Sequence, residues 1–331
     1  MTVRIGINGF GRIGRSYLRA ALRSDADVRV VAINDIADAA SLASLLEWDS
    51  LSGHLEGVEA AGDAIIVGGE RIRATSEREP GQIAWGDERV DVVIESTGRF
   101  TDSADARQHL AAGARKVIIS APAGHDVPSV VLGVNDNEID TSDDVFSNGS
   151  CTTNCLAPMA KVLHEAFGIE SGLMTTIHAY TSDQRLHDAP HGDLRRARAA
   201  ALSTIPTSSG AAGTIGRIIP SLNGRLTALS LRVPVPVGSI TDLTAQLSRP
   251  ATVEEVNAAF RTAASSAPLS QYLSYSEAPL VSADIVGNPF SAIFDAPLTQ
   301  AVGHQVKIFA WYDNEWGFSN RLVELSQRVG S

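Results

Sequence analysis

The sequence predicts an α/β protein in which a doubly wound, mostly parallel sheet is followed by an α+β domain with a mixed sheet. Two observations support this prediction. Short, continuously apolar runs alternate with helical periodicity through the first 150 residues, as expected for parallel strands covered by helices on both faces. Beyond them, strand patterns follow one another with fewer helices between, which indicates a mixed sheet covered on one face. We therefore expect two domains, residues 1–150 and 151–331.

Composition limits the classes of protein that the chain can represent. Its 331 residues suffice for two domains, and its formal charge of −11 argues against sequence-independent nucleic-acid binding. Two cysteines, Cys151 and Cys155, fit neither a disulfide framework nor a common zinc spacing. No apolar run approaches a membrane span, and no leader pattern precedes the first strand. We expect a cytoplasmic protein with no membrane partner and no bound metal.

The first strand and helix enclose a glycine motif. Val3–Ile7 is typical of a buried strand, and residues 9–14 read Gly-Phe-Gly-Arg-Ile-Gly directly before a helical run. Such glycines let the backbone approach a pyrophosphate at the helix N-terminus. A second strand, Val28–Ile33, leads to Asp35, whose carboxylate can bind an adenosine ribose and repel a 2′-phosphate. This placement favours a Rossmann-type domain that binds NAD over a glycine turn without a ligand.

The rest of the first domain continues the alternation of strands and helices. Residues 58–75 mix short apolar runs with turn signals, which predicts inserted antiparallel strands. Two further apolar strands, Val90–Ser96 and Lys116–Ser120, are separated by a helical stretch from Ser103 to Ala112. Ligands bind at the carboxyl ends of strands in such sheets. Those ends are marked here by Thr97 and Ser120.

Hydroxyl and amide residues surround the first cysteine. Residues 147–158 read Ser-Asn-Gly-Ser-Cys-Thr-Thr-Asn-Cys-Leu-Ala-Pro, and an apolar-periodic run follows. A cysteine at a helix N-terminus lies among unpaired N–H groups and the positive end of the helix dipole, which lower the pKa of its thiol. We therefore interpret Cys151 as a nucleophile, and Cys155, one turn further into the helix, as a packed side chain.

The second domain is expected to contain a strand over Gly172–Ala179, which includes His178, and a long ordered loop over residues 182–206. A lone histidine at a strand end is more often structural, but beside a nucleophile it is a candidate base. Arg232 is a lone charge in an apolar strand, which is costly unless an anion pairs with it. Later strands are expected at Leu226–Val233, Ser239–Ser248, Ala292–Phe294 and Val306–Tyr312, and later helices at Thr252–Ala264 and Gly317–Arg328.

The cysteine cluster resembles the active-site signature of the phosphorylating glyceraldehyde-3-phosphate dehydrogenases. The similarity extends from the glycine motif to Trp-Tyr-Asp-Asn-Glu-Trp-Gly at residues 311–317. The resemblance implies an NAD-dependent enzyme of glycolysis and gluconeogenesis that converts D-glyceraldehyde 3-phosphate and inorganic phosphate to 1,3-bisphosphoglycerate. It also implies a homotetramer, in which the C-terminal helix, at about 317–331, packs back onto the NAD-binding domain.

The resemblance assigns roles to individual residues. Cys151 adds to the aldehyde as a thiohemiacetal, and His178 removes the hydroxyl proton, which leaves a thioester for phosphate to cleave. The NAD-binding residues are Gly9, Gly11, Arg12, Ile13, Gly14, Asp35, Arg78, Thr97, Ser120, Asn314 and Phe318. The substrate phosphate is bound by Thr181, Asp183 and Arg232, and the attacking phosphate by Ser150, Thr152, Arg196, Ser209 and Gly210.

Four residues near the nucleophile or the nicotinamide depart from the family pattern. They are Gly149 for Ala, Ser182 for Asn, Ser209 for Thr and Phe318 for Tyr. The glycine is expected to add backbone freedom that costs roughly 0.5–1 kcal/mol in ordered structure. Because these positions lie where an electrophilic inhibitor would sit, they indicate either a self-resistance copy of the enzyme or tolerated drift.

Two other functions are compatible with parts of the pattern. An erythrose-4-phosphate dehydrogenase would share the nucleophile and cofactor motifs but release its acid by hydrolysis. A non-catalytic nucleotide-binding or moonlighting protein would need to have lost Cys151 or His178, and both are present.

Overall fold

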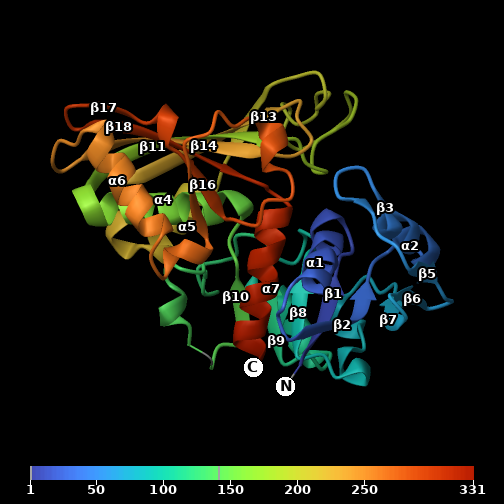
Figure 1. The fold of residues 1–331 in the computed structure, drawn as a ribbon. Helices are drawn as coiled ribbons and strands as arrows, with labels where there is room; N and C mark the ends of the chain where they lie inside the picture. The colour runs from blue at the N-terminus through green and yellow to red at the C-terminus, as the bar shows by residue number, and fades with distance from the viewer. Residues whose placement is uncertain (1, 141) are drawn as a thin grey trace. The chain divides into compact units, whose positions relative to one another are not determined.

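The computed structural model describes residues 2–140 and 142–331, which form two compact units (Figure 1). The first unit comprises the residues up to 130, residues 138–149 and residues 319–331. The second comprises residues 131–137 and 150–318. Over the described ranges, no helix combines the length and the apolarity that crossing a bilayer requires.

An eight-stranded sheet in the order β10-β9-β8-β1-β2-β7-β6-β5 forms the centre of the first unit. The strands from β10 to β7 pair in parallel, whereas β6 pairs antiparallel with both β7 and β5. The predicted mostly parallel sheet with inserted antiparallel strands is therefore confirmed. The bounds are Val3–Asn8 (β1), Val28–Asn34 (β2), Val58–Ala60 (β5), Ala64–Val67 (β6), Glu70–Thr75 (β7), Val92–Glu95 (β8), Lys116–Ile119 (β9) and Val145–Ser147 (β10), with a separate hairpin of Trp48–Asp49 (β3) and Gly53–His54 (β4).

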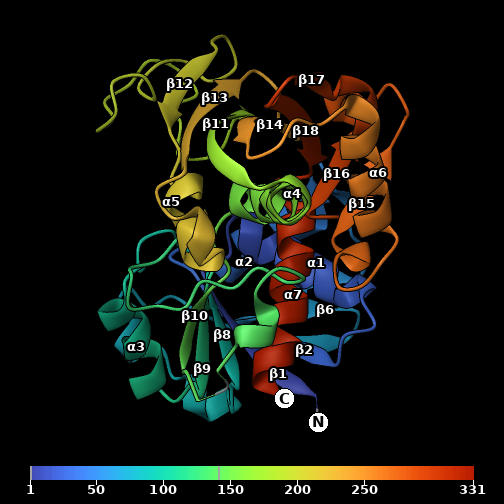
Figure 2. The ribbon, with the colours of Figure 1, turned by 90° about the vertical axis from the view of Figure 1, so that its left-hand side faces the viewer.

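Helices cover both faces of this sheet, and Figure 2 shows α3 on the opposite side of the strands from α1 and α7. Tyr17 of α1 and Ser326 of α7 form a hydrogen bond of 2.6 Å, which joins the C-terminal helix to the first helix. Asp38 and Asp102 cap α2 and α3 by accepting backbone N–H groups. The helices are α1 (Arg12–Arg23), α2 (Ala39–Glu47), α3 (Ser103–Ala111) and α7 (Trp316–Gly330), the last beginning in the second unit.

The second unit contains a mixed sheet in the order β12-β13-β11-β14-β18-β16-β15, with β17 paired to β18. The pairs β11/β13 and β15/β16 are parallel and the others are antiparallel. The bounds are Ile169–Ala179 (β11), Ile205–Ser208 (β12), Leu226–Val233 (β13), Ser239–Leu247 (β14), Leu273–Ser276 (β15), Ala292–Asp295 (β16), Gln300–Val302 (β17) and Gln305–Tyr312 (β18).

One face of the second sheet packs against helices α4 (Cys151–Phe167), α5 (Ala211–Ile218) and α6 (Val253–Ala264), as Figure 2 shows. Alternate residues of each strand enter this core: Met174 of β11, Leu243 of β14 and Ile308 of β18 are buried together with Leu163 of α4. The period of two thus separates a helix-covered face from an open one. Short 3-10 helices occur at Pro80–Gln82, Trp85–Glu88, Asp136–Glu138, Pro220–Leu222, Leu269–Gln271, Ser282–Ile285 and Ala296–Leu298.

The long segment after β11 has no regular element until β12 begins at Ile205. An isolated parallel bridge between Arg185 and Ala199 closes it into a folded loop. This agrees with the ordered loop expected over residues 182–206. The sequence patterns did not indicate α2, α5, or the short strands β3, β4, β10, β12, β15 and β17.

Candidate active site

The glycine motif forms the turn between β1 and α1. Gly9 has a φ of +88°, and a Cβ added to it would lie 2.7 Å from the backbone nitrogen of Thr97, so only glycine fits. A Cβ on Gly14 would overlap the carbonyl oxygen of Gly9. Space around Gly11 is open, and no side chain caps the helix that begins after it. An uncapped helix N-terminus facing open space fits the pyrophosphate of a dinucleotide.

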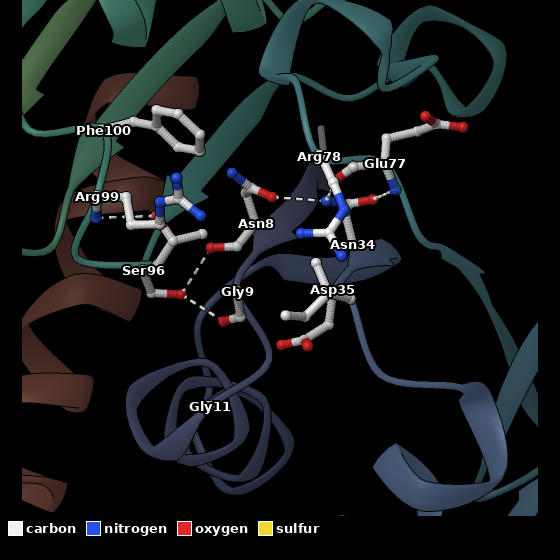
Figure 3. A pocket seen from close by; sticks show the side chains of 12 residues that line it. Asn8, Gly9, Gly11, Asn34, Asp35, Glu77, Arg78, Ser96, Arg99 and Phe100 are labelled. Atoms are coloured by element: carbon white, nitrogen blue, oxygen red, sulfur yellow. Dashed lines mark hydrogen bonds between the residues drawn. The ribbon is translucent and has the colours of Figure 1, made fainter. Parts of the chain in front are cut away.

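A cavity of about 250 Å³ lies beside this turn (Figure 3). In Figure 3, Asp35 and Arg78 lie on one side of the cavity, and Arg99 and Phe100 lie on the other. Of the predicted cofactor residues in the first unit, the lining contains Gly9, Gly11, Asp35, Arg78 and Thr97, but not Arg12, Ile13, Gly14 or Ser120. The lining also contains residues that the sequence did not indicate: Asn8, Asn34, Ile36, Glu77, Ser96, Arg99 and Phe100.

Asp35 is held rigidly at the end of β2. Its Oδ2 accepts the backbone N–H of Phe10 at 2.7 Å, and its Oδ1 accepts that of Ala37 at 3.1 Å. The Arg12 side chain pairs with Asp49. A fixed carboxylate at this edge of the cavity suits the hydroxyl groups of an adenosine ribose and disfavours a 2′-phosphate.

We expect the enzyme to use NAD with a kcat/KM at least about a hundred-fold above that for NADP, because a 2′-phosphate would face the Asp35 charge. Asp35→Asn removes the charge with little change in shape, and should lower this ratio about ten-fold or more. The ratio of kcat/KM values for the two cofactors measures the effect. Glu77→Gln is the matched control, since it neutralises another carboxylate of the lining. Comparable use of NADP by the unaltered enzyme would contradict the role of Asp35.

A buried polar network supports the floor of the cavity. Glu95 Oε2 accepts from Asn8 Nδ2 at 2.6 Å and from His109 Nε2 at 3.1 Å, while Oε1 accepts from the backbone N–H of Thr97 at 2.8 Å. The indole N–H of Trp85 donates to His109 Nδ1 at 3.0 Å, which leaves the proton of a neutral ring on Nε2. The network therefore fixes Asn8 and Thr97, which line the cavity.

Cys151 is the first residue of α4, at the position expected from the sequence. Ser150 caps the helix, because its Oγ accepts the backbone N–H of Thr153 at 3.1 Å. The sulfur of Cys151 lies 3.4 Å from Nε2 of His178, near the end of β11. The structure thus brings the two predicted catalytic side chains into contact within the second unit. Among the described residues, no group of His, Cys, Asp and Glu side chains forms a metal site.

Gly149, two residues before the nucleophile, has a φ of +63°. This left-handed backbone strains any residue that carries a Cβ. The expectation that glycine weakens the ordered structure here is therefore wrong, because glycine relieves strain that alanine would introduce.

Gly149→Ala is accordingly expected to lower the free energy of unfolding by about 1–2 kcal/mol. Gly213→Ala is the matched control, and its effect on the free energy of unfolding should have the opposite sign. Gly213 lies inside α5, and the space that a Cβ atom would occupy is open. That substitution should stabilise the protein by about 1 kcal/mol. Urea titrations of both variants measure the two effects, and a stabilised Gly149→Ala protein would contradict the strain.

Burial dominates the protonation of the catalytic pair. It raises the pKa of the Cys151 thiol, an effect that the charge of Arg232 partly opposes. Burial, together with the same arginine, lowers the pKa of His178 to about 3. His178 is therefore neutral at pH 7. The direction of the shift of the Cys151 pKa is opposite to the one expected from the helix N-terminus, because desolvation is the largest contribution to the pKa of the thiol.

The lowered pKa of His178 makes stability depend on pH. Its imidazole takes up a proton below about pH 6.5 in the unfolded chain and only below about pH 3 in the folded one. Stability is therefore lost as the pH falls through this window. Between about pH 6 and pH 4 the unaltered protein should lose up to about 1.4 kcal/mol per pH unit more than His178→Asn. Urea unfolding at several pH values gives both slopes, and equal slopes would contradict a neutral, buried His178.

Arg232 and His178 are brought together by strand register. They are paired residues of the parallel strands β13 and β11. Nδ1 of His178 lies 2.7 Å from Nη1 of Arg232 and also 2.7 Å from the carbonyl oxygen of Ala179. In a neutral imidazole, Nδ1 either accepts from the guanidinium or donates to the carbonyl, and cannot do both.

Tyr312 contacts the ring of His178, a role that the sequence did not indicate. Its hydroxyl forms hydrogen bonds of 2.9 Å with Thr152 and 2.8 Å with Thr176, and its ring meets that of His178 edge-on at 5.9 Å. The hydroxyl of Thr152, assigned to the attacking phosphate by resemblance, is thus engaged with Tyr312. The only sequence signal was the alternation that puts Thr176 and His178 on one face of β11.

The loop after β11 gathers several of the predicted phosphate-binding residues. The Thr181 hydroxyl donates to Asp183, which pairs with Arg196 at 2.8 Å. Arg196 also donates through Nε to the hydroxyl of Thr207 at 2.8 Å. These contacts connect Thr181, Asp183 and Arg196 in one cluster, although the resemblance assigns them to two anion sites.

The remaining predicted residues lie at two other helix starts of the second unit. Ser209 and Gly210 precede α5, and the space around Gly210 is open. Asn314 is buried in the turn after β18, where Oδ1 of Asp313 accepts the N–H groups of Glu315 and Trp316. Phe318, in the first turn of α7, is buried.

The first unit has the features of a dinucleotide-binding domain, and the second contains a cysteine in contact with a histidine. These features together are typical of nicotinamide-dependent oxidoreductases that act through a covalent cysteine intermediate. Residues 3–103 match the family model of the glyceraldehyde 3-phosphate dehydrogenase NAD binding domain, and residues 150–314 match that of the C-terminal domain. The chain belongs to the glyceraldehyde-3-phosphate dehydrogenase family.

Similar proteins of this family occur in species of Streptomyces and Mycobacterium. The chain is 58% identical over 333 residues to glyceraldehyde-3-phosphate dehydrogenase 2 of Streptomyces arenae, with 100% of this chain and 99% of the relative covered. It is 58% identical over 337 residues to the enzyme of Mycobacterium avium and 57% identical over 338 residues to that of Mycobacterium tuberculosis, with the same coverage. NAD is accordingly its cofactor, and the glycine turn and cavity of the first unit fit that molecule.

Proposed function

We propose that the enzyme oxidises D-glyceraldehyde 3-phosphate to 1,3-bisphosphoglycerate, with inorganic phosphate as second substrate, in glycolysis and gluconeogenesis. The observation that carries the proposal is the 3.4 Å contact between Cys151 Sγ and His178 Nε2, with Arg232 paired to His178 in the adjacent strand. Thr181, Asp183 and Arg232 bind the substrate phosphate, and Ser150, Thr152, Arg196, Ser209 and Gly210 bind the attacking one.

The chain's own residues carry the bond changes at sulfur and the proton transfers. Cys151 Sγ forms a bond to the aldehyde carbon while its proton passes through Nε2 of His178 to the new hydroxyl group. Nε2 then accepts the hydroxyl proton as the thiohemiacetal is oxidised to a thioester. NAD, when bound, supplies the hydride acceptor. A phosphate oxygen finally attacks the thioester carbon, and the departing Cys151 sulfur regains a proton from His178.

The contacts of Nδ1 couple substrate binding to the base. While Arg232 donates to Nδ1, the proton of the neutral ring lies on Nε2, which cannot accept another. Once Arg232 turns its donors to a substrate phosphate, Nδ1 donates to the carbonyl oxygen of Ala179 instead. Nε2 then presents its lone pair to the thiol. The substrate phosphate thereby prepares His178 to act as the base.

A substrate panel tests the reaction. NADH formation from D-glyceraldehyde 3-phosphate should require inorganic phosphate, and D-erythrose 4-phosphate should react far more slowly. Efficient phosphate-independent oxidation of D-erythrose 4-phosphate to its acid would favour erythrose-4-phosphate dehydrogenase. Binding of NAD without turnover of any aldehyde would favour the non-catalytic function.

We also propose an NAD-binding domain over residues 1–150 and a catalytic domain over 151–331, whose C-terminal helix, at about 317–331, packs back on the first domain. We propose, too, a cytoplasmic homotetramer without nucleic-acid or membrane partners. The open face of the second sheet supports assembly, since Leu173 of β11 and Leu229 of β13 are 67% and 45% exposed there. Sedimentation of the purified enzyme tests the tetramer, and a monomer at micromolar concentration would contradict it.

Self-resistance is a finer proposal that rests on Gly149, Ser182, Ser209 and Phe318. The left-handed backbone gives Gly149 a structural role of its own, so the inhibitor hypothesis needs a direct test. We expect an epoxide sesquiterpenoid to alkylate Cys151 more slowly in the unaltered enzyme than in Gly149→Ala or Gly149→Ala/Phe318→Tyr. Equal rates would exclude specialisation at these positions.

A further inference from the structure

Ser239 lies in the second sheet where β14 begins and where the neighbouring strands β11 and β18 end. It is the first residue of β14 and is fully buried. It is paired with Tyr312, the last residue of β18, while its neighbour Ile240 is paired with Ile177 of β11. Its hydroxyl therefore lies between the strand that carries His178 and the turn that follows β18.

Two hydrogen bonds fix the orientation of this hydroxyl. Ser239 Oγ accepts the backbone N–H of Ala179 at 3.1 Å and donates to Oδ1 of Asn314 at 3.0 Å. Since the Ala179 N–H can only donate, the single hydroxyl hydrogen remains for Asn314. The oxygen of the Asn314 amide therefore faces Ser239. Over residues 2–140 and 142–331, the NH₂ group of this amide makes no hydrogen bond.

The backbone around Asn314 is fixed by other groups. Oδ1 of Asp313 accepts the N–H groups of Glu315 and Trp316, and Oδ2 accepts that of Gly287 at 2.8 Å. These bonds place the turn but leave the amide free to rotate by 180°, because its oxygen and nitrogen ends have nearly the same shape. The Ser239 hydroxyl distinguishes the two ends, since it can donate only to the oxygen.

We propose that Ser239 is a positioning residue for the nicotinamide end of NAD. It orients the Asn314 amide so that NH₂, and not oxygen, meets the carbonyl oxygen of the nicotinamide carboxamide. Its second bond, to Ala179, holds this amide at a set distance from the backbone next to His178. The inference rests on the proposed role of Asn314 in binding the carboxamide.

Binding measurements with two ligands test this role. ADP-ribose contains the adenosine and pyrophosphate of NAD but no nicotinamide ring. By calorimetry, Ser239→Ala should raise the Kd of NAD about three- to ten-fold, as expected for one lost neutral hydrogen bond, and leave that of ADP-ribose unchanged. Thr241→Val is the matched control, because Thr241 lies two residues along β14 and is equally buried. It should leave both constants unchanged.

A double-mutant cycle shows whether Ser239 acts through Asn314. In an Asn314→Ala background, Ser239→Ala should add no further loss of NAD affinity. The positioning role of Ser239 would be overturned if Ser239→Ala weakened the binding of NAD and of ADP-ribose equally. It would also be overturned if Ser239→Ala weakened NAD binding as much in the Asn314→Ala background as in the unaltered protein. Neither result would affect the role of Asn314. An unchanged NAD affinity in Asn314→Ala itself would overturn the role of Asn314 as well. If Ser239→Ala does not fold, Ser239→Cys, with its weaker donor, serves in the same comparisons.

Discussion

Cys151→Ser is expected to abolish acyl-enzyme formation and to lower kcat by at least about 10⁴-fold. A serine hydroxyl in the same position is far harder to deprotonate than a thiol, and the lowered pKa of His178 increases the cost of transferring the proton from a hydroxyl to its imidazole. The measurement is the burst of NADH when enzyme, NAD and D-glyceraldehyde 3-phosphate are mixed without phosphate. The variant should show no burst, and mass spectrometry should find no acyl adduct.

Cys155→Ser is the matched control for this experiment. Cys155 lies one turn further along α4 and is fully buried in the core of the second unit. Its replacement places a hydroxyl in an apolar region and should lower stability, yet the burst should persist with one adduct per active site. A normal burst from Cys151→Ser, or an adduct on Cys155 in the unaltered enzyme, would contradict the assignment of Cys151 as the nucleophile.

The long elements of the fold were predictable because their patterns are local. The glycine turn before α1 and the apolar strands on both sides of it define the parallel sheet, and β11, β13, β14 and β18 all begin and end within three residues of the predicted bounds. Short strands such as β12 and β15 owe their existence to pairing with distant partners. Such pairing leaves no period in four residues of sequence.

The catalytic pair was predictable for a similar reason. The capping residues and the cysteine are contiguous at residues 150–153, and the structure places Cys151 at the first turn of α4. Tyr312, Ser239 and the Glu95–His109 pair gave no such signal, since each acts through residues distant in sequence. The direction of the pKa shift of the thiol also escaped prediction, because desolvation is a property of the folded chain and the helix dipole alone would lower this pKa.

His178→Asn is expected to lower kcat by about 10²–10⁴-fold, the range that a positioned general base contributes. The asparagine amide can occupy the position of Nδ1 and still donate to the Ala179 carbonyl oxygen, but it has no group at the position of Nε2 and cannot accept a proton at neutral pH. Binding of NAD should be unchanged. Single-turnover mixing should show that the loss lies in formation of the thioester.

The pH dependence of the two enzymes separates base catalysis from a structural role. In the unaltered enzyme, neutral His178 takes the thiol proton directly, so acylation should proceed well below the raised pKa of Cys151. In His178→Asn, acylation should increase ten-fold per pH unit as hydroxide replaces the base. His164→Asn is the control, because His164 lies at the far end of α4 and binds Ser221, and it should keep near-normal turnover. Near-normal turnover of His178→Asn, or an acylation rate independent of pH in that variant, would refute the assignment of His178 as the base.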